Sequence, residues 1–324
     1  AVVTYCVGGF NIIDPVGCAF AEKSPLVIIS GAPGIKERDE EFLPHHMVRE
    51  FECQHEVFEH ITCANTVLRN PATAAYEIDR VLAACKHYKQ PVYIELPRDM
   101  VSKPISYDAW SVGTPPNKKS DVETLEESIQ EASKWIDSAR KPVILAGVEV
   151  ARFNFGVQLT KFAERLNIPI ATTILGKSAV NEKHGLSLGV FCGELANERC
   201  AKAISESDCL IMLGVEMTDI SVGFLPHKVF KRNAIISTCD ETSIRRHTFT
   251  KVNFDDFFDN LTKIESSRKH WKEIPESEPR KYVAENKKLT TSRLFDKINS
   301  IITEKVAIIA DVGDSMFGSC GITV

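Results

Sequence analysis

The sequence predicts an α/β protein built from doubly wound parallel sheets. Short apolar runs alternate with segments of helical periodicity, which is typical of βαβ units. The runs VIIS at 27–30 and VYIEL at 92–96 are rich in β-branched residues, as expected of strands covered on both faces. Glycines follow several such runs, at the edge where a parallel sheet places its ligand-binding loops.

The first block of this pattern ends near residue 104. Its expected strands are VVTY at 2–5, PLVIISGAP at 25–33 and QPVYIELP at 90–97, and a small-residue segment at 11–22 follows the first of them. One helix is expected before the last strand, with Asn70 as its cap and Pro71 in its first turn. The apolar positions that recur at helical spacing there are Ala75, Ile78, Leu82 and Cys85.

A second block repeats the alternation. Its expected helices are 125–139, 155–166 and 194–204, and its expected strands are 142–147, 168–173, 209–215 and 234–238. A third block then begins, with one helix at 292–302 and one strand, VAIIADVGDS, at 306–315.

Two polar, proline-containing stretches divide these blocks. We therefore expect linkers at 105–120 and 266–288. The domains would be 1–104, 121–265 and 289–324. We expect the third to be incomplete, since one helix and one strand cannot form a core, and the first as well, since Ala1 begins directly in a strand-like run with no βα unit before it.

Composition limits the function. The 324 residues are 44% hydrophobic and 26% charged, with a net charge of -5, so no basic field attracts nucleic acid. No apolar run approaches the roughly 20 residues that cross a bilayer, which indicates no membrane partner. The ten scattered cysteines form no C-x-x-C pair; we read them as reduced, which favours a cytoplasmic location.

An adjacent histidine pair is the most unusual local feature. His45 and His46 stand in EEFLPHHMVREF, in an expected loop, and two imidazoles can donate protons or orient an anion. Adjacent histidines are also common as plain polar loop residues. Nearby, HEVFEH resembles a zinc-protease motif, but His55 and His60 are five apart rather than four, so we reject that site.

The strand-ending glycines are weaker signals. Gly31, Gly147, Gly214 and Gly313 each follow an apolar run, and none belongs to a G-x-G-x-x-G fingerprint. Tight turns explain such glycines without a ligand. Asp314 and Ser315, after Gly313, could hold a phosphate at a helix start, although an N-cap role is the ordinary explanation.

Taken in order, several segments resemble the pyruvate and indolepyruvate decarboxylase branch of the thiamine diphosphate enzymes. VVTYCVGGFN is similar to the family's VTY-x-VGA segment, AFAEKSPLVIISGAP to its AYAE-x-P stretch, and LPHHM to its L-HH loop. KPVILAGVEVARF, IPIATTILGKSAVNEKH, GVFCGEL and LGVEMTDI resemble central-domain segments, and IIADVGDSMFG resembles AETGDSWF. The match covers nearly the whole chain.

The resemblance implies pyrimidine-binding, central and diphosphate-binding domains, in that order. It implies nonoxidative decarboxylation of a 2-keto acid to an aldehyde and CO2 through a thiamine diphosphate-bound carbanion/enamine. The chain would hold the back of the first domain, all of the second and the opening of the third. The Mg²⁺ ligands, the glutamate that contacts the pyrimidine and two further catalytic acids have no matching position here.

Site residues follow from the same resemblance. His45 and His46 would be the catalytic proton relay, Thr4 would line the substrate pocket, and Val7 would pack near the aminopyrimidine. The cofactor contacts of the third domain would be Gly313, Asp314 and Ser315, while Val312 departs from the family's frequent threonine. A homodimer or homotetramer is implied, because family active sites lie between two chains.

Two other functions stay open. An acetolactate synthase-like carboligase would share the three-domain plan, although such enzymes usually lack the histidine pair. A noncatalytic binding module is the better reading if the natural chain is this short.

Overall fold

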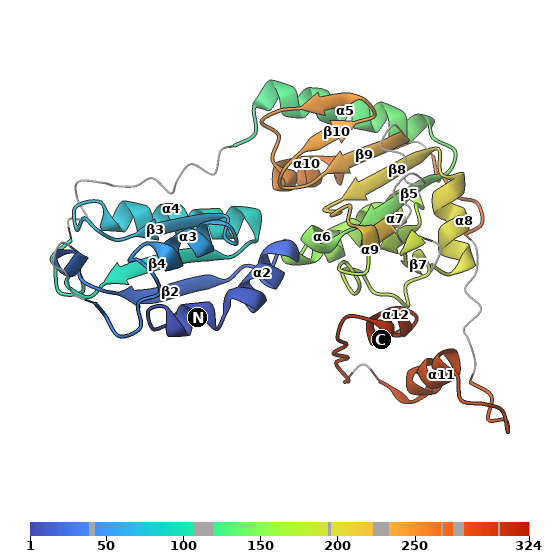
Figure 1. The fold of residues 1–324 in the computed structure, drawn as a ribbon. Coiled ribbons are helices and arrows are strands. Elements are labelled where there is room, and N and C mark those ends of the chain that lie inside the picture. Colours follow the sequence, from blue (N-terminus) through green and yellow to red (C-terminus); the bar gives the residue numbers. More distant parts are fainter. Residues whose placement is uncertain are drawn as a thin grey trace. The chain divides into compact units, whose positions relative to one another are not determined.

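A computed structural model describes residues 1–38, 43–105, 119–193, 196–222, 233–266, 268–274, 282–303 and 305–323. They form two compact units, Ala1–Lys119 and Ser120–Val324 (Figure 1). The five-part domain division stays a prediction, because most of the expected linker at 105–120 and part of that at 266–288 lie outside the described residues.

The first unit is built on a parallel four-stranded sheet of order β1-β2-β4-β3. Its strands are β1 (Val2–Val3), β2 (Val27–Ala32), β3 (Ala64–Val67) and β4 (Val92–Pro97). Its helices are α1 (Val7–Phe10), α2 (Ile13–Ala21), the 3-10 turn η1 (Lys36–Arg38), α3 (Cys53–Glu59) and α4 (Ala74–Tyr88).

Helices cover both faces of this sheet. On one face, Val81 of α4 joins a core with Val92 and Ile94. On the other, residues of α2 and α3 pack on Ile28 and Tyr93. Burial on both faces explains why the central strands are rich in β-branched residues.

Helix α4 begins later than the sequence suggested. Asn70 does not cap it: its side chain accepts from the backbone N–H of Ala72 within a turn, and the helix starts at Ala74. The Asx turn competes with helix for the same backbone donors, which delays the start. Leu82, expected on the apolar stripe, is 40% exposed.

The second unit contains a seven-stranded sheet of order β11-β10-β9-β8-β5-β6-β7. Its strands are β5 (Pro142–Ala146), β6 (Ile170–Thr172), β7 (Ser187–Val190), β8 (Cys209–Leu213), β9 (Ala234–Ser237), β10 (Thr242–Ile244) and β11 (His247–Phe249). Strands β5 to β9 pair in parallel, whereas β10 and β11 add an antiparallel edge that the sequence did not predict.

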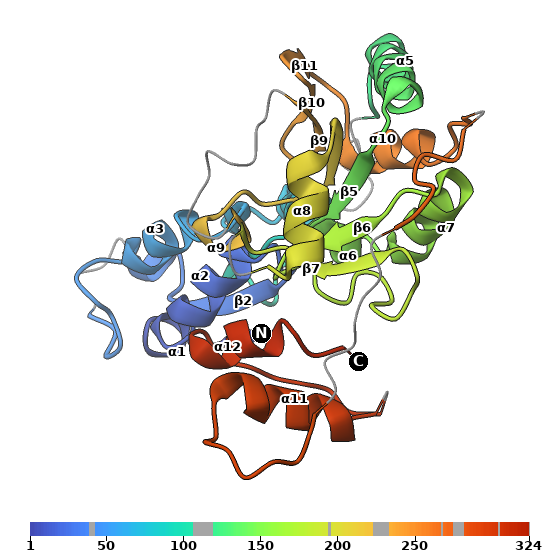
Figure 2. The same ribbon diagram turned by 90° about the vertical axis from the view of Figure 1, so that its right-hand side faces the viewer.

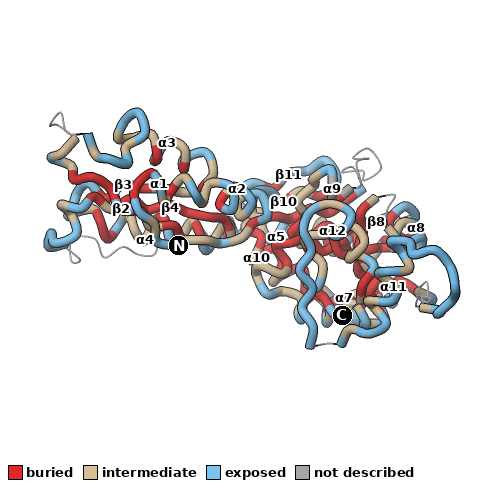
Figure 3. The backbone as a smooth tube through the Cα atoms, turned by 60° about the horizontal axis from the view of Figure 1, so that its bottom comes forward, coloured by how far each residue is buried: buried red, intermediate tan, exposed pale blue. Residues whose placement is uncertain are grey.

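Alternate residues of the central strands pack into two different cores. Ile144 and Ile211 lie in a core with α5 (Val122–Ser138), α7 (Gly156–Leu166) and α10 (Phe254–Leu261). Leu145 and Met212 face α8 (Glu198–Glu206), which crosses the other face of the sheet (Figure 2). Figure 3 shows these strands as the buried centre of the unit.

The remaining helices here are the short α6 (Val148–Arg152) and α9 (Asp219–Val222). The doubly wound architecture is therefore confirmed.

The strand expected at 306–315 is wrong. Residues 306–311 form no secondary structure and connect α11 (Thr291–Ile301) with α12 (Asp314–Ser319). Ile309 is 97% exposed. An apolar run becomes a strand only when another strand supplies its hydrogen bonds, and none in the described residues does so.

None of the helices in the described part of the chain is long and apolar enough to cross a bilayer.

Candidate functional site

The predicted histidines occupy the tip of a tight turn. The N–H of Met47 donates to the carbonyl of Pro44 over 2.9 Å, so His45 and His46 are the two central residues of this turn. Both are exposed. Their ring centroids lie 3.8 Å apart with planes tilted by 48°. Two imidazoles are thus presented together to solvent.

Contacts on either side fix this turn to the segment that follows β1. Met47 packs on a small cluster that contains Tyr5 and Cys6. The Tyr5 hydroxyl donates to the carbonyl of Phe51 over 3.0 Å. Thr4 adjoins these two anchoring residues, so the structure brings its segment beside the histidine turn. Thr4 is exposed.

Val7 is likewise placed just beyond the anchoring residues. It is the first residue of α1 and is 47% exposed. Four of the predicted site residues therefore lie in neighbouring segments of the first unit.

A buried polar network lies beneath the turn. Gln54 of α3 accepts from the N–H of Cys6 over 2.6 Å and donates to Ser30 and to the hydroxyl of Tyr93. Tyr93 in turn donates to Glu95 over 2.7 Å. Burial raises the pKa of Tyr93, and the nearby charge of Glu95 raises it further. The Tyr93 hydroxyl therefore keeps its proton and acts as a donor.

Cys6 carries backbone strain at the head of α1. Its φ of 52° and ψ of -77° lie in a region that residues with a side chain rarely adopt. The surrounding structure must hold such a residue in place. The hydrogen bond from its N–H to the fully buried Gln54 is one such restraint.

The segment that leads from β2 into η1 is held by residues that follow β4. Asp99 accepts from the backbone N–H groups of Ile35 and Lys36, and these bonds hold the pKa of its carboxyl below the usual range. Arg98 binds Glu37 and lowers the pKa of that carboxyl. The segment at 34–37 is therefore fixed to the residues that follow β4.

The predicted cofactor residues of the third block lie in the second unit. Gly313 is the N-cap of α12, with φ of +116°, and nothing stands within 4 Å of the place where a Cβ would be. This corrects the N-cap expectation for Asp314 and Ser315, which belong to the first turn of the helix. The Ser315 hydroxyl donates to the carbonyl of Asp311 over 2.8 Å. A left-handed φ explains why Gly313 takes the cap.

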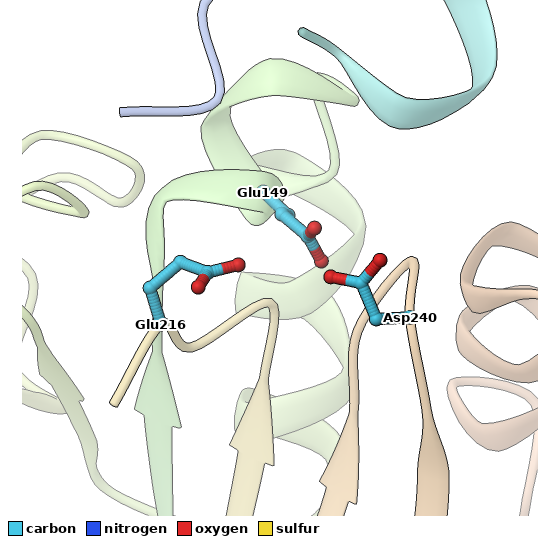
Figure 4. A group of neighbouring side chains, drawn as sticks. All are labelled: Glu149, Glu216 and Asp240. Atoms are coloured by element: carbon cyan, nitrogen blue, oxygen red, sulfur yellow. The ribbon is translucent and has the colours of Figure 1, made fainter. Parts of the chain in front are cut away.

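The sequence analysis missed a group of acidic residues in the second unit. Glu149, Glu216 and Asp240 offer carboxylate oxygens that lie within 4.8 Å of one another, and the three side chains point toward a common space (Figure 4). They follow the adjacent strands β5, β8 and β9, and Glu149 accepts from the N–H of Cys239. Acidic groups gather at strand ends without an ion as well, so we assign no site to them.

The two histidines of HEVFEH do not form a common site. His55 on α3 contacts Asn65 over 3.0 Å and Glu59 over 3.7 Å, whereas His60 is the C-cap residue of that helix.

Comparison with known proteins identifies what the chain is similar to. Residues 129–254 match the family model of the thiamine pyrophosphate enzyme central domain. Over 322 residues the chain is 31% identical to indole-3-pyruvate decarboxylase of Azospirillum brasilense. The resemblance to thiamine diphosphate-dependent decarboxylases is confirmed.

Pyruvate decarboxylases are also similar to this chain, with lower sequence identity. The chain is 26% identical to the enzyme of Kluyveromyces lactis and 25% identical to isozyme 3 of Saccharomyces cerevisiae. All three alignments cover 98% of this chain but only 58% of each relative. The chain thus spans little more than half the length of these decarboxylases.

Proposed function

We propose that the whole protein is a thiamine diphosphate-dependent 2-keto acid decarboxylase that releases an aldehyde and CO2. The observation that carries the proposal is the paired imidazole turn, set beside the end of a parallel strand in a chain similar throughout to decarboxylases. Ligands of open α/β sheets bind at this carboxyl edge.

The described residues fit part of the cofactor. Gly313 leaves its backbone open to a ligand, and Asp314 and Ser315 are exposed beside it. Thr4 and Val7 are exposed in the first unit. We therefore propose that Gly313, Asp314 and Ser315 contact the diphosphate side, that Val7 packs near the aminopyrimidine, and that Thr4 lines the substrate pocket. The Mg²⁺ ligands would come from residues outside these 324.

The chemistry divides between the cofactor and the chain. When bound, thiamine diphosphate supplies the electron sink that accepts the bonding electrons as CO2 departs. An imidazole ring nitrogen can bind a proton and release it, so His45 and His46 can hold a proton there and deliver it to the reacting carbon or oxygen. Their exposed position on a fixed turn lets both rings reach a substrate.

The setting of the protein belongs to the same proposal. We infer a small 2-keto acid substrate, a homodimer or homotetramer, and a cytoplasmic location. None of the ten cysteines forms a disulfide in the structure, which supports a reducing compartment.

Product analysis tests this function. The natural full-length protein would be incubated with thiamine diphosphate, Mg²⁺ and a series of 2-keto acids. The aldehyde and the acetolactate-type products, which are 2-hydroxy-3-keto acids, would then be quantified. We expect aldehyde as the main product. Acetolactate-type products in its place would establish the carboligase, and no turnover with any keto acid would favour a binding module.

Single histidine variants test the proton relay. We expect His45→Ala and His46→Ala each to lower kcat by about 10²- to 10⁴-fold, the range typical of a lost general acid or base. His247 is an exposed histidine of the second unit, which pairs with Glu131, and His247→Ala is the matched control. Equal activity of all three variants would remove the histidine pair from the mechanism.

A further inference from the structure

The residues that border the histidine turn converge on one buried carboxylate. Arg38 precedes the turn and Glu52 follows it, and the Arg38 guanidinium binds Glu52 through Nη1. The same guanidinium donates through Nη2 to Glu95 Oε1 over 3.0 Å. Glu95 belongs to β4, in the centre of the sheet. One planar cation therefore joins the residues on both sides of the histidine turn to an inner strand of the sheet.

Burial makes this junction specific. Glu95 is 0% exposed, and the Arg38 side chain is only 10% exposed. The second Glu95 oxygen accepts from Tyr93, so both oxygens have donors. Burying two charges costs desolvation energy that their attraction does no more than offset, so such a pair contributes little net stability. Its effect is to fix where the guanidinium stands.

The far side of the loop is held as well. Glu52 accepts from Arg69 through its other oxygen over 2.6 Å, so Glu52 is placed between two guanidinium groups. Glu52 is also the N-cap residue of α3, the helix that carries Gln54 of the polar network. A displacement of Arg38 would thus free the segment at 43–52 from its attachment to β4.

We propose that Glu95 is a positioning residue, which acts through Arg38 and Glu52 to hold the His45–His46 turn in the geometry that proton transfer requires. This inference rests on the proposed function. Glu95 stands too deep in the sheet to touch a substrate, because its side chain is fully covered. Its role in turnover is therefore indirect.

Two substitutions break the junction at different points. Glu95→Gln keeps the shape of the side chain but removes its charge and one of its two acceptor oxygens, so it cannot accept from both Tyr93 and Arg38. Arg38→Lys keeps the charge but loses the planar fork, so it can reach Glu52 or Glu95 and not both. We expect both variants to release the same segment.

Tyr93→Phe is the matched control. It removes a hydrogen bond from the same buried network, yet leaves the contacts of Arg38 with Glu95 and Glu52 in place and keeps the ring that stacks on Phe58. All three variants therefore disturb the interior of the unit, and only two of them break the junction.

The measurements are amide hydrogen exchange of the peptide at 43–52 and steady-state kinetics, both on the full-length holoenzyme. For Glu95→Gln and Arg38→Lys we expect exchange about tenfold faster in this peptide. We expect kcat to fall about 10²-fold, as for a misplacement near 1 Å, with KM within about threefold of the original value. Tyr93→Phe should keep both exchange and kcat within about twofold.

Two outcomes would overturn the proposal: unchanged exchange at 43–52 in Glu95→Gln, or equal losses of kcat in Glu95→Gln and Tyr93→Phe, which would mark a merely structural role. If the unsubstituted holoenzyme releases no CO2, the proposed function fails and the catalytic part of this proposal fails with it. The exchange data separate that failure from a failure of the junction itself.

Discussion

A single methyl group added at Gly147 should destabilise the second unit. Gly147 follows β5, and a Cβ built there would stand 1.9 Å from the carbonyl oxygen of Gly214, which follows β8. A Cβ atom essentially never comes within 3.0 Å of a non-bonded heavy atom. Gly147→Ala must therefore move the backbone at 147 and the backbone at 214 apart by about 1 Å.

The size of the loss follows from what that separation breaks. The N–H of Gly147 donates to Leu213 over 2.8 Å, and the N–H of Glu149 donates to Gly214 over 3.2 Å. Each backbone hydrogen bond contributes about 0.5–1.5 kcal/mol and overpacking costs about 1–3 kcal/mol. We therefore expect Gly147→Ala to lower the free energy of unfolding by about 3 kcal/mol.

Urea unfolding followed by tryptophan fluorescence measures this change, because Trp135 and Trp271 are both buried in the second unit. A loss of about 3 kcal/mol should lower the midpoint by about 1 M or more. Gly185→Ala is the control, since Gly185 lies in the same unit but has nothing within 4 Å of a Cβ. Equal midpoints for the two variants would refute the steric argument.

Two further predictions concern titratable groups of the interior. Burial lowers the pKa of His270, whose Nδ1 donates to the carbonyl of Ala139. As pH falls, this histidine therefore binds its proton in the unfolded chain before it does so in the folded one. The stability of the second unit should decrease as pH drops below about 6.5. Melting curves from pH 8 to 5 should show this slope and His270→Asn should flatten it, whereas the same slope in both proteins would contradict the assignment. Burial raises the pKa of Cys192 to about 11, and partial burial raises that of Cys63 to about 12. Brief iodoacetamide treatment at neutral pH should therefore label the exposed Cys18 before either, as read by peptide mass spectrometry, and early labelling of Cys63 would contradict its raised pKa.

The sequence predicted those strands that are buried and therefore consist mainly of apolar residues. The runs that became β2, β4, β5 and β8 are apolar and bounded by turn residues. By contrast β3, β7, β10 and β11 are short or polar, and they exist because a neighbouring strand pairs with them. The same dependence on pairing explains the failed strand at 306–315.

Some residues of the candidate site could likewise be recognised in the sequence, and others could not. His45 and His46 were visible because two adjacent imidazoles are unusual in a sequence. Glu95 was not, since it lies inside a strand run and its partner Arg38 stands 57 positions earlier. Only the order of the strands reveals that these two charges meet.

The acidic group of Glu149, Glu216 and Asp240 was missed for the same reason, because its members meet only through the order of the strands. Glu149 and Glu216 each stand two residues after a strand-ending glycine, which is a visible pattern, but their meeting with Asp240 depends on the adjacency of β5, β8 and β9.

The central claim is carbon–carbon bond cleavage that depends on thiamine diphosphate. The most direct measurement follows a 2-keto acid labelled with ¹³C at its carboxyl group, incubated with the full-length protein with and without thiamine diphosphate and Mg²⁺. We expect labelled CO2 and unlabelled aldehyde in equal amounts, and neither product without thiamine diphosphate. Label retained in the keto acid under both conditions would contradict the proposed function.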